Sequence, residues 1–216
     1  MIKLKFKNKF LNKYSSDYEY RFIVNTIISF VFTIFFAFYN LLIGIYYKTQ
    51  FNISISVYYF LLIIIRIVAF VNELKERKNN KPYKGLNVIQ AIIMLLMNIS
   101  LFAPVTIMVF GKRVVNYGTI SAITVATYTT FKVISTIIAY FKKKKYTIIN
   151  IKMFKTIKLQ DSLLSSLTLQ NTLVMTFNKE AFESIQTLIA ISSFLIVSLM
   201  IFISIRTLIN FIKESN

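Results

Sequence analysis

The sequence contains no cysteine and no histidine. The first absence excludes disulfides, thiolate nucleophiles and Cys/His zinc sites, and the second excludes an imidazole general base. Acidic residues are scarce as well, with 8 aspartates and glutamates in 216 residues, most of them between the apolar segments. An enzyme built on this chain would have few acid–base groups. We therefore expect a protein that is not an enzyme and that has no resident cofactor.

Glycine and proline are also rare, with 4 and 2 residues respectively. The chain shows no Gly-rich phosphate loop, no nucleophile elbow and no pair of carboxylates at metal-binding spacing. No loop between the apolar segments is long enough for a soluble domain, and the internal repeat of many transporters is not visible. Function is therefore expected within the apolar segments or at their ends.

The dominant feature of the chain is a series of long apolar segments. Hydrophobic residues make up 56% of the chain, and the charged residues, 16%, are grouped between those segments. A bilayer core of ~30 Å is crossed by about 20 helical residues. The pattern predicts an all-α, polytopic integral membrane bundle with six transmembrane helices in a single domain, residues 22–212, after a basic N-terminal tail, residues 1–21. The predicted spans are 22–47, 53–71, 88–110, 119–141, 157–177 and 188–211.

Local signals mark the ends and bends of two of these spans. The first apolar run is about twice the usual length of a signal-peptide core, so we interpret it as a retained span. Ser16 and Glu19 fit a capping box at its start. Pro104 lies inside the third predicted span and removes one helical hydrogen bond, which predicts a kink near Ser100.

The fifth predicted span, 157–177, is the most polar. At 3.6 residues per turn, a stripe of polar side chains runs along one face, and several leucines lie away from it. The stripe contains Asp161, Ser165, Thr168, Thr172 and Thr176. Such a helix can span if the stripe faces other helices, and the alternative is a helix lying in the cytoplasmic interface. We favour a spanning helix.

The net charge of +18 could indicate nucleic-acid binding, but its distribution argues against it. With six spans, 18 of the 26 lysines and arginines fall in segments 1–21, 72–87 and 142–158, against 4 in the loops on the other side. Basic loops stay on the cytoplasmic side and attract anionic lipid. We expect a multi-pass protein of the cell membrane with both termini cytoplasmic, in contact with anionic headgroups and not with nucleic acid.

Four ionisable residues fall inside the predicted spans: Arg66, Lys132, Asp161 and Arg206. Both arginines lie close enough to the predicted inner edge for their side chains to snorkel to the headgroups. Lys132 is nine residues from Phe141, or about 13–14 Å at 1.5 Å per residue, near the middle of the core. Lys132 is therefore expected to face the bundle interior.

The partner of Lys132 stays open at this point. Asp161 is the only carboxylate within a span and would lie about 6 Å from the inner edge, closer in depth to Arg66 than to Lys132. A structural ion pair or hydrogen-bonded lysine is one interpretation. A ligand site is the other: if cations outnumber the acid, the phosphate of a lipid or an anionic solute could supply the missing charge. The candidate polar site within the bundle comprises Lys132, Asp161, Arg66, Thr168, Thr172 and Gln170.

Uncharged amides within or beside the spans have a simpler explanation. Interhelical hydrogen bonds are the usual role of such groups and contribute roughly 0.6–2 kcal/mol each. We expect this role for Asn25, Asn40, Gln90, Asn98, Gln170 and Asn171.

Three short patterns resemble those of a known group of proteins. They are Tyr39-Asn40 before Gly44, Tyr58-Tyr59 before Arg66, and Tyr128-Thr129 before Lys132. In these the chain resembles a group of six-span hypothetical membrane proteins of low-GC Gram-positive bacteria. The resemblance covers most of the chain and implies the same topology, but it implies no chemistry.

Two functions are compatible with these features. The first is non-enzymatic transport or binding of a lipid or small solute through a polar bundle interior. The second is an accessory or regulatory subunit that binds another membrane protein through its basic cytoplasmic face. A vitamin-transporter binding component has a similar span number, but the first span lacks the expected Ala-x-x-x-Ala pattern. An open polar cavity at Lys132 would indicate transport, and a sealed core would indicate a subunit.

Overall fold

The computed structural model describes residues 18–79, 84–111, 117–141, 150–177 and 182–215. Within these ranges the chain is helical apart from short connections, and no strand occurs. The helices are α2 (Tyr18–Tyr46), α3 (Gln50–Asn79), α4 (Lys84–Ser100), α5 (Phe102–Phe110), α6 (Gly118–Phe141), α7 (Asn150–Phe177) and α8 (Phe182–Ser215). The prediction of an all-α bundle is confirmed.

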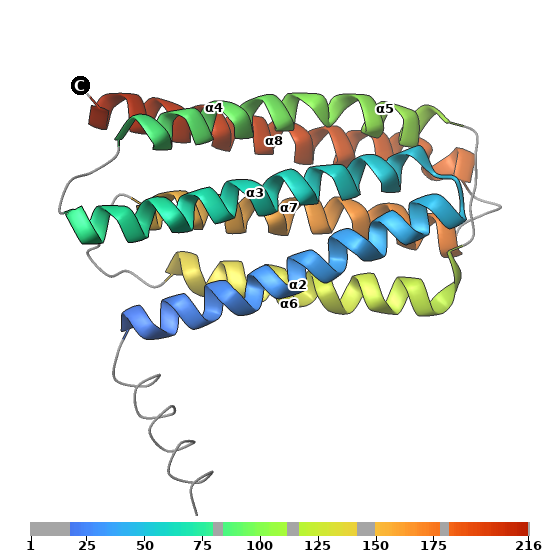
Figure 1. The fold of residues 1–216 in the computed structure, drawn as a ribbon. Helices are drawn as coiled ribbons and strands as arrows, with labels where there is room; N and C mark the ends of the chain where they lie inside the picture. Colours follow the sequence, from blue (N-terminus) through green and yellow to red (C-terminus); the bar gives the residue numbers. More distant parts are fainter. Residues whose placement is uncertain (1–17, 80–83, 112–116, 142–149, 178–181, 216) are drawn as a thin grey trace, which may run out of the picture.

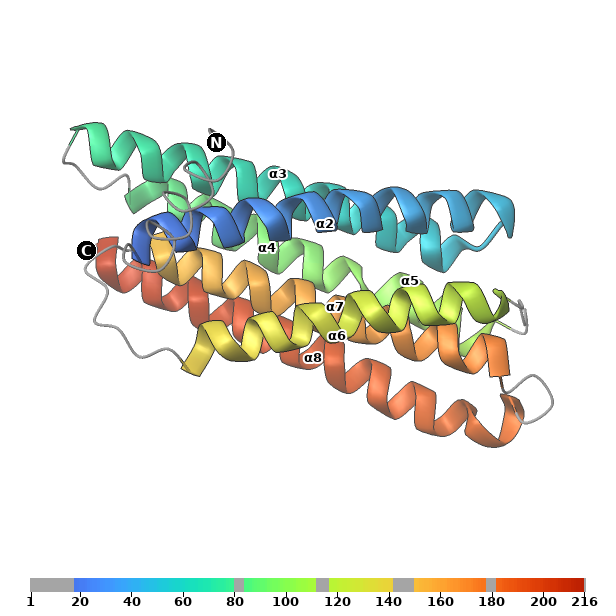
Figure 2. The same cartoon turned by 90° about the horizontal axis from the view of Figure 1, so that it is seen from below.

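Five stretches of the described chain are long and apolar enough to cross a membrane: α2, α3, α4 with α5, α6 and α8. The helices lie side by side in three tiers, with α4, α5 and α8 at the top, α3 and α7 in the middle, and α2 and α6 at the bottom (Figure 1). The strongest pairings are α2 with α3, α6 with α7, and α4 with α8. The start of α2 and the end of α8 lie at the same end of the bundle (Figure 2).

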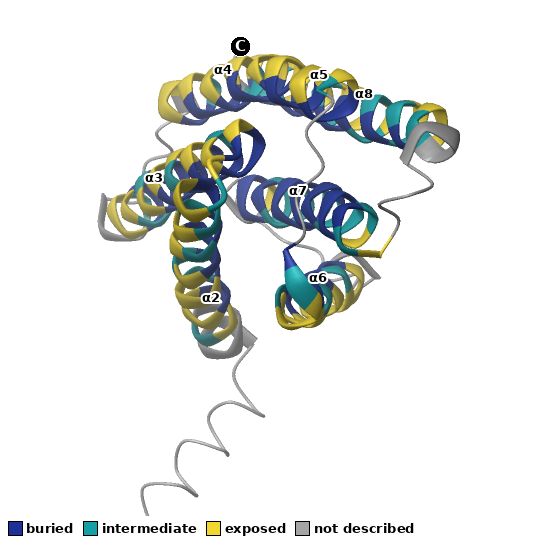
Figure 3. Ribbon diagram, turned by 90° about the vertical axis from the view of Figure 1, so that its right-hand side faces the viewer, coloured by how far each residue is buried: buried dark blue, intermediate teal, exposed yellow. Residues whose placement is uncertain are grey.

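The outer faces of the bundle are apolar and its interior contains many polar groups. Phe35, Leu42 and Ile120 are 70%, 66% and 84% exposed, whereas Thr33 and Ser56 are fully buried. The exposed faces point away from the bundle axis on α2, α3, α4 and α8 (Figure 3). An apolar surface around hydrogen-bonded polar side chains suits a hydrocarbon solvent rather than water. The structure is therefore compatible with a multi-pass membrane protein.

Helix α7 lies in the interior of the bundle, where it packs against α3, α6 and α8. Its polar stripe is buried, as at Asp161, Ser165 and Thr168, but Leu164 and Leu167 on other faces are also fully buried. Burial on several sides explains how the most polar helix can lie within an apolar bundle. The part of α7 that carries the polar stripe is packed among other helices of the bundle.

The third predicted span is interrupted at Leu101, between α4 and α5, so the predicted kink near Ser100 is confirmed. Pro104 has no N–H to donate to the carbonyl of Ser100, four residues earlier. At the break, the Leu101 N–H donates to the Asn98 carbonyl, three residues earlier, at 3.3 Å, and Ser100 Oγ donates to the Met97 carbonyl at 2.7 Å.

Several helices are longer than their apolar runs. Helix α7 begins at Asn150 rather than at residue 157, α8 begins at Phe182 rather than at 188, and α3 continues to Asn79 rather than ending at 71. The length of an apolar run is set by the thickness of the hydrocarbon layer. A helix can continue beyond that layer into polar sequence, because its backbone hydrogen bonds are formed within the helix. Ser16 of the expected capping box, most of the basic tail and residues 142–149 lie outside the described residues.

Candidate functional site

Asp161 is the centre of a buried ionic cluster. Lys132 Nζ lies 2.5 Å from Asp161 Oδ2, and Arg66 Nη2 lies 3.1 Å from the same oxygen. Lys132 and Arg66 are each 3% exposed, and Asp161 is 0% exposed. The structure therefore brings together three of the residues of the candidate polar site, one each from α3, α6 and α7. We refer to Arg66, Lys132 and Asp161 as the ionic cluster.

Helix α2 completes the cluster with hydroxyl groups. Lys132 Nζ donates to Thr33 Oγ1 at 2.7 Å and to Ser29 Oγ and the Ser29 carbonyl at 3.2 Å. Arg66 Nη1 donates to Thr33 Oγ1 at 3.2 Å, and Thr33 Oγ1 lies 3.1 Å from Asp161 Oδ2. Buried charges require this degree of hydrogen bonding.

Tyr128 also contacts the ionic cluster. Its hydroxyl donates to Asp161 Oδ1 at 3.3 Å, and Lys132 Nζ lies 5.2 Å from the centre of its ring. The sequence analysis did not assign Ser29, Thr33 or Tyr128 to the site. A signal was present, because Ser29 and Thr33 are four residues apart, as are Tyr128 and Lys132, and such pairs share a helix face.

The structure corrects the depths expected for two of these residues. Arg66 does not snorkel, because its guanidinium group is buried and lies 3.1 Å from Asp161 Oδ2. Asp161 lies level with Lys132 rather than nearer the inner edge, since their charged groups are in direct contact. Arg206 differs from both, since it is exposed on α8 as snorkelling requires.

The other residues of the candidate polar site lie away from the ionic cluster. Thr168 and Thr172 are buried and donate to carbonyls of their own helix, those of Leu164 and Thr168, at 3.0 and 2.8 Å. Gln170 turns towards α8, where its Nε2 donates to Ser192 Oγ at 2.6 Å. Gln170 therefore connects two helices, as expected for an amide in a membrane bundle.

A second polar network connects the upper and middle tiers. Asn98 Nδ2 donates to Ser204 Oγ at 2.6 Å, and Gln160 Nε2 donates to the same hydroxyl at 3.1 Å. Both amides also donate to the Met200 carbonyl, and the Tyr58 hydroxyl donates to Asn98 Oδ1. These bonds join α3, α4, α7 and α8, which explains the polar residues there without a ligand.

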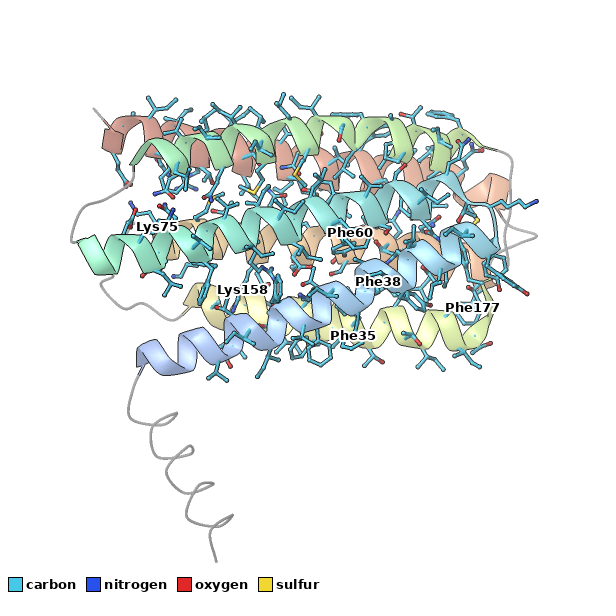
Figure 4. The ribbon with its side chains drawn as sticks, viewed as in Figure 1. Phe35, Phe38, Phe60, Lys75, Lys158 and Phe177 are labelled. Atoms are coloured by element: carbon cyan, nitrogen blue, oxygen red, sulfur yellow. The ribbon has the colours of Figure 1, made fainter. Side chains whose placement is uncertain are left out.

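The ionic cluster has more positive than negative charge. Lys158 lies one turn before Asp161 on α7, and its carbonyl accepts a bond from Thr136 Oγ1 on α6 at 3.2 Å. Lys158 is half-buried and interacts electrostatically with Arg66, Lys132 and Asp161. It lies between the middle and lower tiers (Figure 4). Three cations thus surround one carboxylate within the described part of the chain.

An apolar groove lies beside the cluster, between α2 and α6, with a volume of about 780 Å³. The rings of Phe36 and Tyr128 line this groove and stack on each other, with centroids 3.7 Å apart. Because the Tyr128 hydroxyl bonds to Asp161, its ring separates the groove from the cluster. Neither of the two cavities described in the structure is lined by Lys132, Arg66 or Asp161. The ionic cluster is therefore buried in this conformation.

No family model, curated protein or solved structure matches this chain. The resemblance to six-span proteins of low-GC Gram-positive bacteria stays a prediction. Within the described ranges, no group of three or more acidic side chains is arranged to hold a metal ion. The ionic cluster and its excess of cations are therefore the features on which a functional proposal has to rest.

Proposed function

We propose that this chain is an integral protein of the cell membrane, with all six helical segments crossing the bilayer, and that it binds a phosphate-bearing anion beside Arg66, Lys132 and Lys158. The anion is the headgroup of a lipid or a small solute. Binding or transport of that anion, without covalent chemistry, is the proposed function. The excess of cations in the ionic cluster is the observation that carries the proposal.

The position of α7 supports the proposed membrane topology. Five segments have the length and apolarity of spans, and α7 runs among them with its polar side chains covered by α3, α6 and α8. With α7 as a sixth span, the chain enters and leaves at one end of the bundle (Figure 1). The predicted distribution of lysines makes that end cytoplasmic.

The electrostatics favour an anion as ligand. Asp161 balances one of the three cations, which leaves two positive charges in a region of low dielectric constant. An uncompensated charge there is costly, and a second negative group lowers that cost. Arginine and lysine together suit phosphate, because the guanidinium group forms directed hydrogen bonds and the ammonium group adds a point charge. Lys158 is the most accessible of the three and provides the first contact.

The first prediction concerns Lys158. Replacing Lys158 with glutamine is expected to weaken binding of phosphatidylglycerol or of inorganic phosphate by about 10-fold, since a charge-assisted hydrogen bond contributes about 1.5–3 kcal/mol. Binding is measured as the concentration dependence of the thermal unfolding midpoint in detergent, with each ligand tested separately. Native mass spectrometry of gently extracted protein shows whether a phospholipid is retained.

Lys75 provides the matched control, because it is an exposed lysine at the same end of the bundle (Figure 4). The variant Lys75→Gln is expected to bind as the unchanged protein does. Stabilisation by phosphatidylglycerol alone would identify a lipid ligand, and stabilisation by inorganic phosphate as well would identify a free anion. Equal binding by Lys158→Gln and the unchanged protein, or no binding of either ligand, would overturn the proposal.

The burial of the ionic cluster favours one second candidate, the accessory subunit. In that case Arg66, Lys132 and Asp161 hold α2, α3, α6 and α7 together, and function lies in the basic cytoplasmic end. The test is co-purification after mild solubilisation from the native membrane. A stoichiometric membrane-protein partner, lost when lysines of that end are replaced, would support the subunit over the anion-binding protein.

A further inference from the structure

A second cavity, lined in part by polar residues, lies at the opposite end of the bundle from Lys158. It has a volume of about 270 Å³ and lies where α3 begins and α5 and α7 end. Its lining includes polar residues, among them Lys48, Thr49, Tyr117 and Asn171, and apolar residues, among them Phe51 and Met108. At ~30 Å³ per water molecule, the space corresponds to roughly nine waters. It can therefore hold a small organic molecule.

Buried polar atoms without partners point to a ligand in this cavity. Thr49 Oγ1 and Asn171 Nδ2 make no hydrogen bond, although their residues are only 9% and 2% exposed. A buried polar group without a hydrogen bond costs about 1–3 kcal/mol. Both residues line this cavity, so a group bound there can satisfy both donors.

The groups around this cavity are mainly hydrogen-bond donors. The turn before α3 places Lys48 in the left-handed region, with φ of 51°, and α3 starts at Gln50 with no acidic residue in its first turn. The first N–H groups of a helix lack acceptors within the helix, and the helix dipole makes that end positive. Asn171 Nδ2, the Thr49 hydroxyl and the Lys48 ammonium group are further donors.

Tyr117 adds a neutral donor. Its hydroxyl interacts with Thr49, Asn171 and Asn52, and its ring packs edge-on against Tyr47 at 5.4 Å between centroids. Burial raises the pKa of Tyr117, an effect only partly offset by those polar neighbours, so the hydroxyl keeps its proton at neutral pH. The phenolic oxygen can accept at most two hydrogen bonds, fewer than the three hydrogens that Asn171 Nδ2 and Thr49 Oγ1 together can donate.

From this arrangement we infer that the cavity binds a small monocarboxylate with an apolar body. The carboxylate accepts hydrogen bonds from Asn171 Nδ2, Thr49 Oγ1 and the positive end of α3, and the apolar body packs against Phe51 and Met108. This site lies at the end opposite to the proposed phosphate site and does not depend on it. It adds a second ligand class to the proposed function.

The probe for this site is isovalerate, a short branched carboxylate, with isovaleramide as its neutral match. Isovalerate is expected to bind saturably to the detergent-solubilised full chain, as followed by saturation-transfer NMR and by a rise in the unfolding midpoint. Thr49→Val and Asn171→Leu remove the donors with little change of volume. Each is expected to raise the dissociation constant by about 10-fold, as loss of a hydrogen bond to a charged group does.

Thr106→Val is the matched control, since Thr106 is an exposed threonine of α5 that bonds to its own helix at the Phe102 carbonyl. This variant and Lys158→Gln are both expected to bind isovalerate normally. Circular dichroism establishes that each variant retains its helix content. Equal affinity for the acid and the amide, unchanged affinity in both Thr49→Val and Asn171→Leu, or absence of saturable binding would each refute the site.

Discussion

Replacing Asp161 with asparagine is expected to destabilise the bundle by about 3–5 kcal/mol, the cost of leaving a buried ion pair without one partner. Asparagine keeps the shape of the side chain but removes the carboxylate that balances Arg66 and Lys132. Lys158 adds to their mutual repulsion. The measurement is thermal unfolding in detergent, followed by the helical circular dichroism signal. We expect a clear fall in the midpoint and in the yield of folded protein.

The response to Lys132→Met makes this prediction specific. That substitution leaves Arg66 paired with Asp161, so it is expected to cost less than half as much as Asp161→Asn. In the double variant Asp161→Asn/Lys132→Met, the loss of a cation should recover part of the stability lost in Asp161→Asn. The difference between its change in stability and the sum of the two single changes measures the coupling between Asp161 and Lys132. If Lys132→Met proves as costly as Asp161→Asn, an excess of positive charge is not what limits the stability of the cluster.

The positions of the helices along the chain were largely predictable from the sequence. The apolar runs located every helical segment, and the predicted ends at residues 110, 141 and 177 match the ends of α5, α6 and α7. The proline-dependent break was predictable because it is a local backbone effect. The starts of α7 and α8 were not, because a helix continues beyond the hydrocarbon layer wherever its backbone bonds remain satisfied.

The contents of the ionic cluster were predictable only in part. The distance of Lys132 from the end of its span indicates an interior position. Asp161, the only carboxylate within a predicted span, was one candidate partner for Lys132, beside a bound anion. The participation of Ser29, Thr33 and Tyr128 depends on how α2 and α6 are rotated about their axes. That rotation is set by packing between helices distant in sequence, such as the stack of Phe36 on Tyr128.

The cavity that we propose to bind a carboxylate was not predictable from the sequence, for the same reason. Thr49, Tyr117 and Asn171 are far apart in the sequence, and each has an ordinary explanation at its own position. The unsatisfied atoms of Thr49 and Asn171 become informative only when the three segments meet at one end of the bundle. Both proposed sites thus depend on how α3, the second helix of the α2–α3 hairpin, packs against α7.

Helix α2 approaches α3 closely at Gly44, and Gly44→Val is expected to destabilise the protein by about 3 kcal/mol. A Cβ atom at Gly44 would lie 2.7 Å from Ile53 Cγ1 and 2.9 Å from the Ile53 backbone nitrogen. Backbone cannot move aside as a flexible side chain can, so α2 and α3 have to separate. The measurement is again the thermal unfolding midpoint in detergent.

Gly85→Ala is the matched control, because a Cβ atom there meets nothing within 4 Å. Gly85 lies in the first turn of α4, where alanine is a better helix former, and its variant is expected to be unchanged or up to about 1 kcal/mol more stable. Gly44→Val should also weaken isovalerate binding, because the Gly44 carbonyl accepts the Thr49 N–H at 2.9 Å. Equal stability of the two variants would mean that α2 and α3 pack less closely than the structure shows.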